Sequence, residues 1–161
     1  MKKNCNLVLG LCFALFYLFS NCVHAQDYGA AIGLRAFTYG GIGVSGKKIF
    51  GENKAIELNA IFRGYSFYNY LEVGALYEKY NEISGVDGLN WLVGGGANVA
   101  FYNYEFSGSD LDFGISGIVG LEYKFPNAPV TIGLDYMPLF WLGDGFFFSS
   151  NRGGFSARYT F

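Results

Sequence analysis

The sequence predicts an all-β protein, an eight-stranded antiparallel up-and-down β-barrel of the transmembrane type, on three observations. Apolar and polar residues alternate with a period of two over most of the chain, which is the pattern of β-strands. Several alternating segments exceed the about 5–6 residues of a globular strand and approach the about 9–11 residues of a tilted membrane strand. Glycine (24 residues) and aromatic residues (20%) are both abundant for a soluble domain. The length of 161 residues predicts a single domain.

The first 25 residues have the pattern of a secretory signal peptide. Two lysines follow the initial Met, residues 7–19 form an apolar stretch, and Val23-His24-Ala25 precedes the expected cleavage site. We therefore expect a mature chain, residues 26–161, that forms one barrel domain. The apolar stretch is short for a membrane anchor of about 20 residues. A lipoprotein signal ending at Cys22 is a further alternative, for which Asn21 is a poor preceding residue.

Removal of this leader limits the chemistry open to the mature chain. It removes every cysteine and the only histidine, which are Cys5, Cys12, Cys22 and His24. Disulfides, zinc sites of thiolates or imidazoles, and Ser-His or Cys-His nucleophile pairs are then excluded. We predict no enzyme, no cofactor and no metal site. Nine basic residues remain against 13 acidic ones, a net charge of −4, which offers no footprint for nucleic acid.

Eight strands are expected, each with one apolar and one polar face. They cover residues 30–37, 41–50, 55–63, 70–80, 89–102, 111–125, 130–142 and 153–161. Their apolar faces carry, in order, Ile32 and Leu34; Ile42 and Val44; Ile56, Leu58 and Phe62; Leu71, Val73 and Tyr77; Trp91, Val93 and Val99; Leu111, Phe113, Ile115 and Val119; Val130, Ile132 and Leu134; Phe155, Ala157, Tyr159 and Phe161. Short turns are expected at residues 51–53, 84–88 and 126–128, and outer loops at 38–40, 64–69, 103–110 and 143–152.

Alternation alone does not say which face points inward. The polar face is crowded with small residues, as the narrow interior of an eight-stranded barrel requires. These are Gly33, Gly43, Gly74, Gly94, Gly96, Gly114, Gly120, Gly133 and Gly154. Aromatic residues of the apolar face gather toward strand ends, as interfacial girdles do. These are Phe50, Tyr77, Trp91, Phe101, Tyr123, Tyr159 and Phe161. We therefore expect the apolar face to point outward; a soluble lipocalin-like carrier would have it inside.

The polar face then becomes the lumen and carries charges of both signs. The expected lumen charge network consists of Arg35, Lys47, Glu57, Arg63, Glu72, Glu78, Asp112, Glu122, Lys124, Asp135 and Arg158. Buried charges persist only when they are paired. We expect structural ion pairs that close the lumen; an ion path or a ligand site is the alternative.

Residues 27–161 resemble the small OmpA- and OmpX-like outer membrane β-barrel family. The most specific element is the C-terminal strand, with a terminal aromatic and the outward residues Phe155, Ala157, Tyr159 and Phe161. It is similar to the signal that the barrel assembly machinery recognises. Gly94-Gly95-Gly96 and residues 120–125 are also similar to compact members. The resemblance implies a Gram-negative outer membrane location, with membrane lipid and the assembly machinery as partners. Because the chain ends at its last strand, no periplasmic peptidoglycan-binding domain is expected.

Three functions are compatible with this class. The first is a non-enzymatic structural or surface-interaction role, in which the aromatic segments 65–68 and 146–148 either contact an unknown surface ligand or extend the interfacial belt. The second is a narrow OmpW-like transporter of small hydrophobic molecules; Pro138 would loosen strand pairing, and Leu92, Met137 and Leu139 would line an apolar path. The third, a barrel enzyme, is disfavoured because the mature chain has no histidine.

Deletion of Phe161 is expected to block barrel assembly without abolishing export, because the terminal aromatic belongs to the predicted assembly signal. Fractionation and immunoblotting measure the outcome. Wild-type amounts of the truncated chain in the outer membrane would contradict the prediction.

Overall fold

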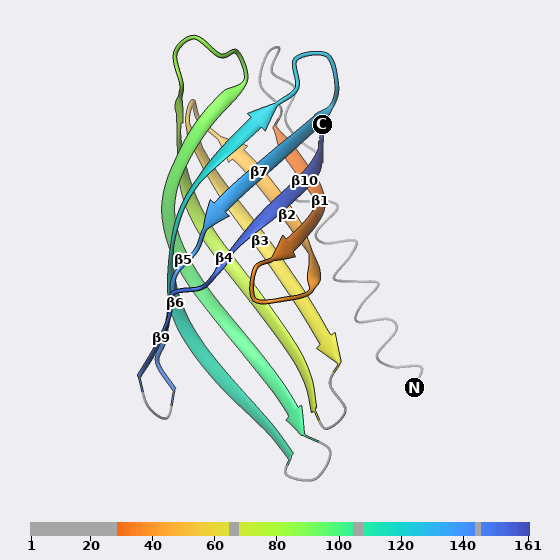
Figure 1. The fold of residues 1–161 in the computed structure, drawn as a ribbon, viewed down its shortest axis with the longest axis vertical. Helices are drawn as coiled ribbons and strands as arrows, with labels where there is room; N and C mark the ends of the chain where they lie inside the picture. Colours follow the sequence, from red (N-terminus) through yellow and green to blue (C-terminus); the bar gives the residue numbers. More distant parts are fainter. Residues whose placement is uncertain (1–28, 65–67, 105–107, 144–145) are drawn as a thin grey trace.

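The computed structural model describes residues 29–64, 68–104, 108–143 and 146–161 (Figure 1). The predicted signal peptide lies outside these residues and stays a prediction. The strands are β1 (Ala30–Phe37), β2 (Ile42–Phe50), β3 (Lys54–Gly64), β4 (Tyr68–Glu82), β5 (Leu89–Tyr104), β6 (Gly108–Lys124), β7 (Val130–Tyr136), β8 (Leu139–Trp141), β9 (Phe147–Ser149) and β10 (Gly153–Thr160). The described residues contain no helix long and apolar enough to cross a membrane.

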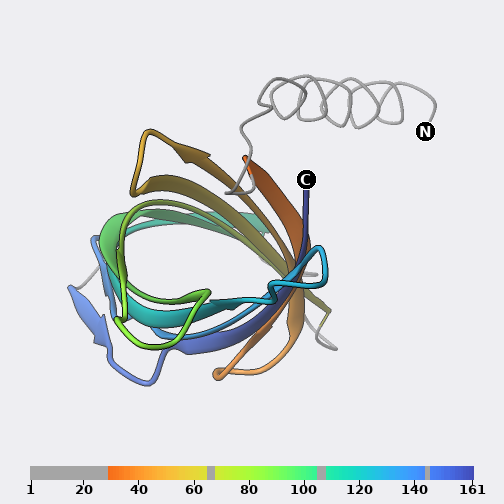
Figure 2. The ribbon, with the colours of Figure 1, turned by 90° about the horizontal axis from the view of Figure 1, so that it is seen from above.

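Eight of these strands pair into a closed antiparallel ring, which Figure 2 shows from above. Neighbours in sequence pair from β1 to β7, β10 pairs with β7, and β1 closes the ring against β10. The longest pairing joins β5 to β6, from Leu89 opposite Tyr123 to Tyr104 opposite Gly108. The predicted eight-stranded up-and-down barrel is confirmed. Closure leaves no free edge along the paired wall.

The predicted seventh strand, residues 130–142, is interrupted. β7 ends at Tyr136 and β8 begins at Leu139, yet both pair with β6 in one register. Pro138 has no N–H to donate; its carbonyl still accepts a hydrogen bond from the Gly117 N–H at 3.1 Å. The interruption is therefore a local loss of pairing inside one continuous wall.

Three of the four predicted outer loops, residues 64–69, 103–110 and 143–152, were too long, whereas the segment between β1 and β2 covers residues 38–41. β4 begins at Tyr68, β5 ends at Tyr104, and β6 begins at Gly108. The segment 143–152, predicted as a loop, contains β9, which pairs with β8 to form a short hairpin. Repeated aromatic residues concealed this hairpin, because they carry no period-two alternation.

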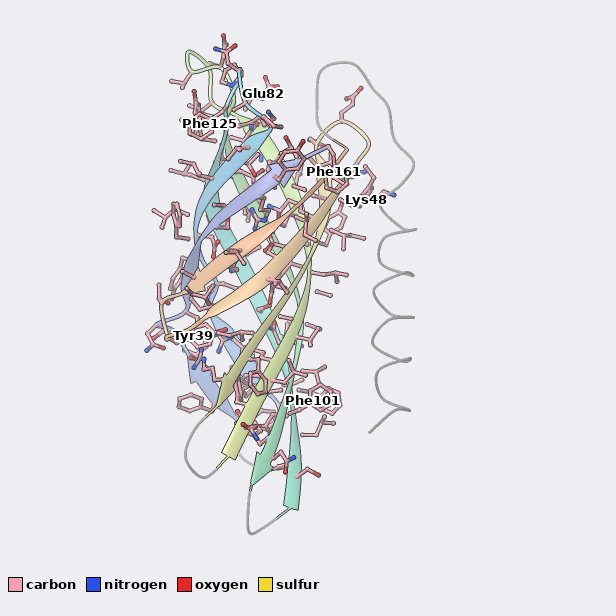
Figure 3. The ribbon with its side chains drawn as sticks, turned by 90° about the vertical axis from the view of Figure 1, so that its right-hand side faces the viewer. Tyr39, Lys48, Glu82, Phe101, Phe125 and Phe161 are labelled. Carbon is pink, nitrogen blue, oxygen red and sulfur yellow. The ribbon has the colours of Figure 1, made fainter. Side chains whose placement is uncertain are left out.

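The apolar face points outward, as predicted, and the lipocalin-like alternative is wrong. On β6, Ile115 is 58% exposed, whereas its neighbour Ser116 is 3% exposed. Six of the seven girdle aromatics are exposed, and Tyr123 is half-buried. In Figure 3, Lys48, Glu82, Phe125 and Phe161 lie toward one end of the barrel and Phe101 toward the other. We call the first the turn end, because it holds the turns after β2, β4 and β6, and the second the loop end.

Two constraints require glycine at the lumenal positions. A Cβ on Gly94 would lie 2.0 Å from the Tyr77 carbonyl oxygen, and one on Gly96 would lie 1.9 Å from that of Ala75. At these positions the adjacent backbone excludes any side chain. A Cβ on Gly74 would instead meet lumenal side chains, 2.8 Å from Asn59 Oδ1. Close strand approach and a filled lumen both require glycine, and the sequence predicted only the second requirement.

Gly96→Ala is expected to destabilise the barrel by about 1–3 kcal/mol, because the backbone must shift to admit the methyl group. Gly117→Ala is the matched control: its Cβ would meet only the Gly94 carbonyl oxygen at 4.0 Å. Urea unfolding in detergent, followed by tryptophan fluorescence, compares the two variants. Equal stabilities would contradict the close-approach argument.

Candidate functional site

Seven charged side chains meet in the lumen and form what we call the central network. They are Arg35 from β1, Lys47 from β2, Glu57 from β3, Glu78 from β4, Glu122 from β6, Asp135 from β7 and Arg158 from β10. Six are buried and Asp135 is half-buried. Every barrel strand except β5 contributes one charge. The network therefore connects almost the whole circumference of the barrel across its interior.

Glu57 lies at the centre of this network and accepts from three cations. Arg35 Nη1 lies 2.9 Å from Oε1, Lys47 Nζ lies 3.1 Å from Oε2, and Arg158 Nη2 lies 2.7 Å from Oε2. The Ser45 hydroxyl also donates to Oε1 at 3.0 Å. Three positive groups around one buried carboxylate hold β1, β2, β3 and β10 in a fixed relation, because each needs that carboxylate to offset its burial.

Lys47 distributes its charge over three carboxylates. Besides Glu57, its Nζ lies 2.8 Å from Glu78 Oε2 and 3.0 Å from Glu122 Oε2. Tyr80 accepts from the same ammonium group and donates to Glu122 Oε1 at 3.1 Å. The second oxygen of Glu78, Oε1, is buried without a hydrogen-bond partner among the described residues. Lys47 thus joins the β4 and β6 sides of the lumen.

The strand register explains how so narrow a lumen holds these long side chains. Most charged residues of the network face a glycine on the neighbouring strand. The pairs are Arg158 with Gly33, Arg35 with Gly43, Glu78 with Gly94, Glu122 with Gly133, and Asp135 with Gly120 and Gly154. Lys47 instead faces Glu57, its ion-pair partner. Most large side chains of the network therefore lie beside a glycine, whose lack of a side chain leaves them room.

A second group lies nearer the loop end, and we call Tyr39, Arg63, Glu72 and Arg152 the arginine–tyrosine cluster. The Arg63 guanidinium carbon lies 4.4 Å from the centre of the Tyr39 ring, and that of Arg152 lies 3.9 Å from it. These are cation–π distances. Arg152 Nη2 also donates to the Tyr39 hydroxyl at 2.9 Å and forms an ion pair with Glu72.

Tyr39 lies in the turn between β1 and β2. Burial, with the nearby Glu72 carboxylate, raises the pKa of its phenol above the ordinary value. The phenol therefore stays protonated and donates to Glu72 Oε2 at 3.4 Å. Glu72 also accepts from Tyr70 and, at 2.8 Å, from the Asn98 amide. One carboxylate thus organises the cluster.

The structure places most of the predicted network residues in two groups. Arg35, Glu57, Glu78, Glu122, Asp135 and Arg158 meet in the central network, together with Lys47. Arg63 and Glu72 belong to the arginine–tyrosine cluster.

Lys124 and Asp112 belong to neither group. Lys124 donates to the Phe125 and Ala128 carbonyls in the turn before β7, and Asp112 lies half-buried beside Gly143. Among the described residues, no ion pair links these two to the other charges. The structure therefore brings neither Lys124 nor Asp112 into these two groups.

Arg152 is the residue that the sequence analysis missed. It was assigned to an outer loop, yet it is 4% exposed and pairs with Glu72. Its even number matches the lumenal parity of Ser156 and Arg158, and this was the available signal. Extending the alternation of β10 backwards through Gly153 and Gly154 would have placed it inside.

The predicted assembly signal keeps its alternation. Phe155, Tyr159 and Phe161 are at least half exposed, and Ala157 is also exposed. The Phe161 N–H donates to the Ala30 carbonyl at 2.9 Å, which ties the terminus to β1. Recognition by an assembly machinery stays a prediction. The described residues contain no group of three or more His, Cys, Asp or Glu side chains able to hold a metal ion.

Fold and lumen together define a small closed barrel of the outer membrane type, and solved structures share it. The N-terminal β-barrel domain of Pseudomonas aeruginosa OprF matches with a TM-score of 0.64 and 15% identity, covering 84% of this chain and all 100% of that one. Neisserial surface protein A, NspA, matches with a TM-score of 0.55 and 14% identity, covering 83% and 97%. No protein-family model matches the sequence, and no curated protein matches it closely. The likeness is therefore one of fold.

Glu57→Gln is expected to cost about 3–5 kcal/mol of unfolding free energy, because it leaves three buried cations without a central carboxylate. Glu78→Gln should cost clearly less, since Glu78 pairs only with Lys47 and has one oxygen without a partner among the described residues. Glu52→Gln, in an exposed turn, is the control. Urea unfolding in detergent measures all three. A Glu78→Gln loss as large as that of Glu57→Gln would show that the charge of Glu57 has no central role.

Proposed function

We propose that this chain is an integral outer membrane barrel with a non-enzymatic, structural or surface-interaction role, and that its charged lumen is closed to solutes. The outward apolar face and the likeness to outer membrane barrels support the membrane location. The predicted signal peptide would deliver the chain to the export pathway.

The central network is the observation that supports the proposal of a closed lumen. Its ion pairs, between 2.5 and 3.1 Å, connect side chains from seven of the eight barrel strands across the interior. An aqueous path through this level would require several buried pairs to separate together. Each separation leaves an unpaired charge in a low-dielectric lumen. Eight strands also leave little width beside filled side chains.

The transporter alternative finds little support in the lumen. Leu92 and Met137 are buried, as predicted, in an apolar group with Leu76 and Ile118. Tyr80 belongs to the same group and hydrogen-bonds to Glu78 and Glu122 of the central network. The apolar residues therefore fill space around the charges, and they do not line a separate path. A surface-interaction role would therefore depend on the loop end and on the outward surface.

Two measurements test this proposal. In an outer membrane fraction, the unboiled protein should migrate differently from the boiled protein on a denaturing gel, because a folded barrel resists the detergent. In planar bilayers, the purified protein should add no stepwise conductance to the bare membrane. Soluble periplasmic protein without a gel shift would overturn the membrane location. Regular conductance steps would overturn the closed lumen.

A further inference from the structure

The barrel wall is incomplete at the loop end. β9 pairs only with β8 and ends the sheet on that side. On the other side, β2 pairs with β3 only as far as Gly43 opposite Ile61, so the last three residues of β3, 62–64, have no partner strand there. We call the space between these two edges the lateral gap. Figure 1 shows its cause: the β1–β2 turn stops well short of the outer ends of β3 to β6.

The base of the lateral gap is the β1–β2 turn. The Thr38 N–H donates to the Gly153 carbonyl at 3.0 Å, and the Thr38 hydroxyl donates to the Asn151 carbonyl at 2.9 Å. These bonds close the wall at that level. Beyond it, the backbone edges of β9 and β3 find no partner among the described residues. Open sheet edges are not tolerated against hydrocarbon, so these edges need a polar partner wherever lipid reaches them.

Two cationic groups meet at the base of the gap. Arg63 extends from the β3 edge, and Arg152 extends from the segment between β9 and β10; both guanidinium groups stack on Tyr39 at the tip of the turn. Figure 3 shows Tyr39 at the end of its hairpin. Arg152 is 4% exposed, and its Nε has no hydrogen-bond partner among the described residues. Glu72 offsets the charge of Arg152, and Arg63 supplies a second cation on the same ring. Two arginines that converge on one ring form a setting for a phosphate group, which accepts from several guanidinium donors at once.

Apolar side chains flank the gap on its outer surface. Ile42 and Phe62, on β2 and β3, are 67% and 64% exposed. Phe140 and Phe148, opposite each other on β8 and β9, are 41% and 57% exposed. An occupant that enters sideways therefore meets apolar surface outside and cationic groups inside. This order matches an amphiphile with acyl chains and an anionic headgroup.

We propose that the lateral gap binds a phosphorylated lipid of the outer leaflet, with its phosphate at Arg63 and Arg152 and its acyl chains against the flanking Phe and Ile side chains. Headgroup hydroxyls and amides would satisfy the free strand edges. This inference rests on the proposed membrane location. It concerns the loop end alone, so it is independent of whether the central network closes the lumen.

The test uses the full-length barrel, refolded in a non-ionic detergent and shown to be folded by its gel shift. Trp91 and Trp141 are the only tryptophans of the chain, and the Trp141 ring lies 5.9 Å from the Arg152 guanidinium carbon. A Trp91→Phe background therefore leaves one fluorophore beside the site. Titrations use lipid A with two phosphates, lipid A with both phosphates removed, and inorganic phosphate.

A saturable change of Trp141 emission is expected with the bisphosphorylated lipid. Half-saturation with the dephosphorylated lipid should need a concentration at least about tenfold higher, equivalent to about 1.4 kcal/mol of binding free energy. Arg63→Gln should weaken binding of the phosphorylated lipid by at least about tenfold. Lys79→Gln, which removes an exposed outward lysine at the turn end, should leave it unchanged. Phe62→Ser, on the outer flank, should weaken lipid binding as a second variant, should Arg63→Gln fail to fold.

The outcomes separate the possible sources of the ligand. Equal affinities for the two lipids would overturn the proposal. Equal affinities of the Arg63→Gln and Lys79→Gln proteins for the phosphorylated lipid would overturn it as well. Inorganic phosphate that saturates the same signal and displaces the lipid at similar concentration would indicate a free-anion site, and so would also overturn the lipid assignment. No response in a protein with a normal gel shift would refute the lipid site and leave the membrane barrel intact. Soluble protein in the periplasmic fraction would instead count against the proposed membrane location.

Discussion

The rest of the structure depends on one constraint: charges enclosed in a narrow barrel must be paired within it. Glu57 and Lys47 each contact three groups of opposite charge. Because a buried ion without a partner costs several kcal/mol, these contacts fix which strands face each other across the lumen. Non-directional apolar packing specifies such relations weakly. The outward apolar face, by contrast, needs only to be apolar.

The lumenal glycines provide the space that this network occupies. Gly94 admits the Tyr77 backbone and at the same time leaves room for Glu78, its cross-strand neighbour. A small residue therefore serves strand approach and charge accommodation together. Composition alone shows many glycines, but only the register shows that they face the charges. The lumen is thus packed by alternation across strands as well as along them.

Period-two alternation made the fold predictable, because it survives in every long strand and distinguishes the two faces. It failed where alternation is absent or interrupted. β9 consists of Phe147, Phe148 and Ser149, without a polar alternate, and Pro138 removes a donor within the seventh strand. The central network was largely predictable because parity decides what enters the lumen. Lys124 shows the limit: parity gives the face, whereas depth along the barrel decides the partner.

The two ends of the barrel follow from unequal strand lengths. β1 and β2 have 8 and 9 residues, whereas β5 and β6 have 16 and 17. A tall wall on one side and a short hairpin on the other expose strand edges that a barrel otherwise conceals. The parity of β10 could place Arg152 inside the barrel, but it could not identify the partners of Arg152, because Tyr39 comes from the β1–β2 turn and Glu72 from β4. The same difference in strand length brings Arg152, with Arg63, to the Tyr39 ring at the base of the lateral gap. Arg152 forms its ion pair with Glu72, which lies outside the central network, so chemistry at the gap can change without disturbing the pairs that hold the fold.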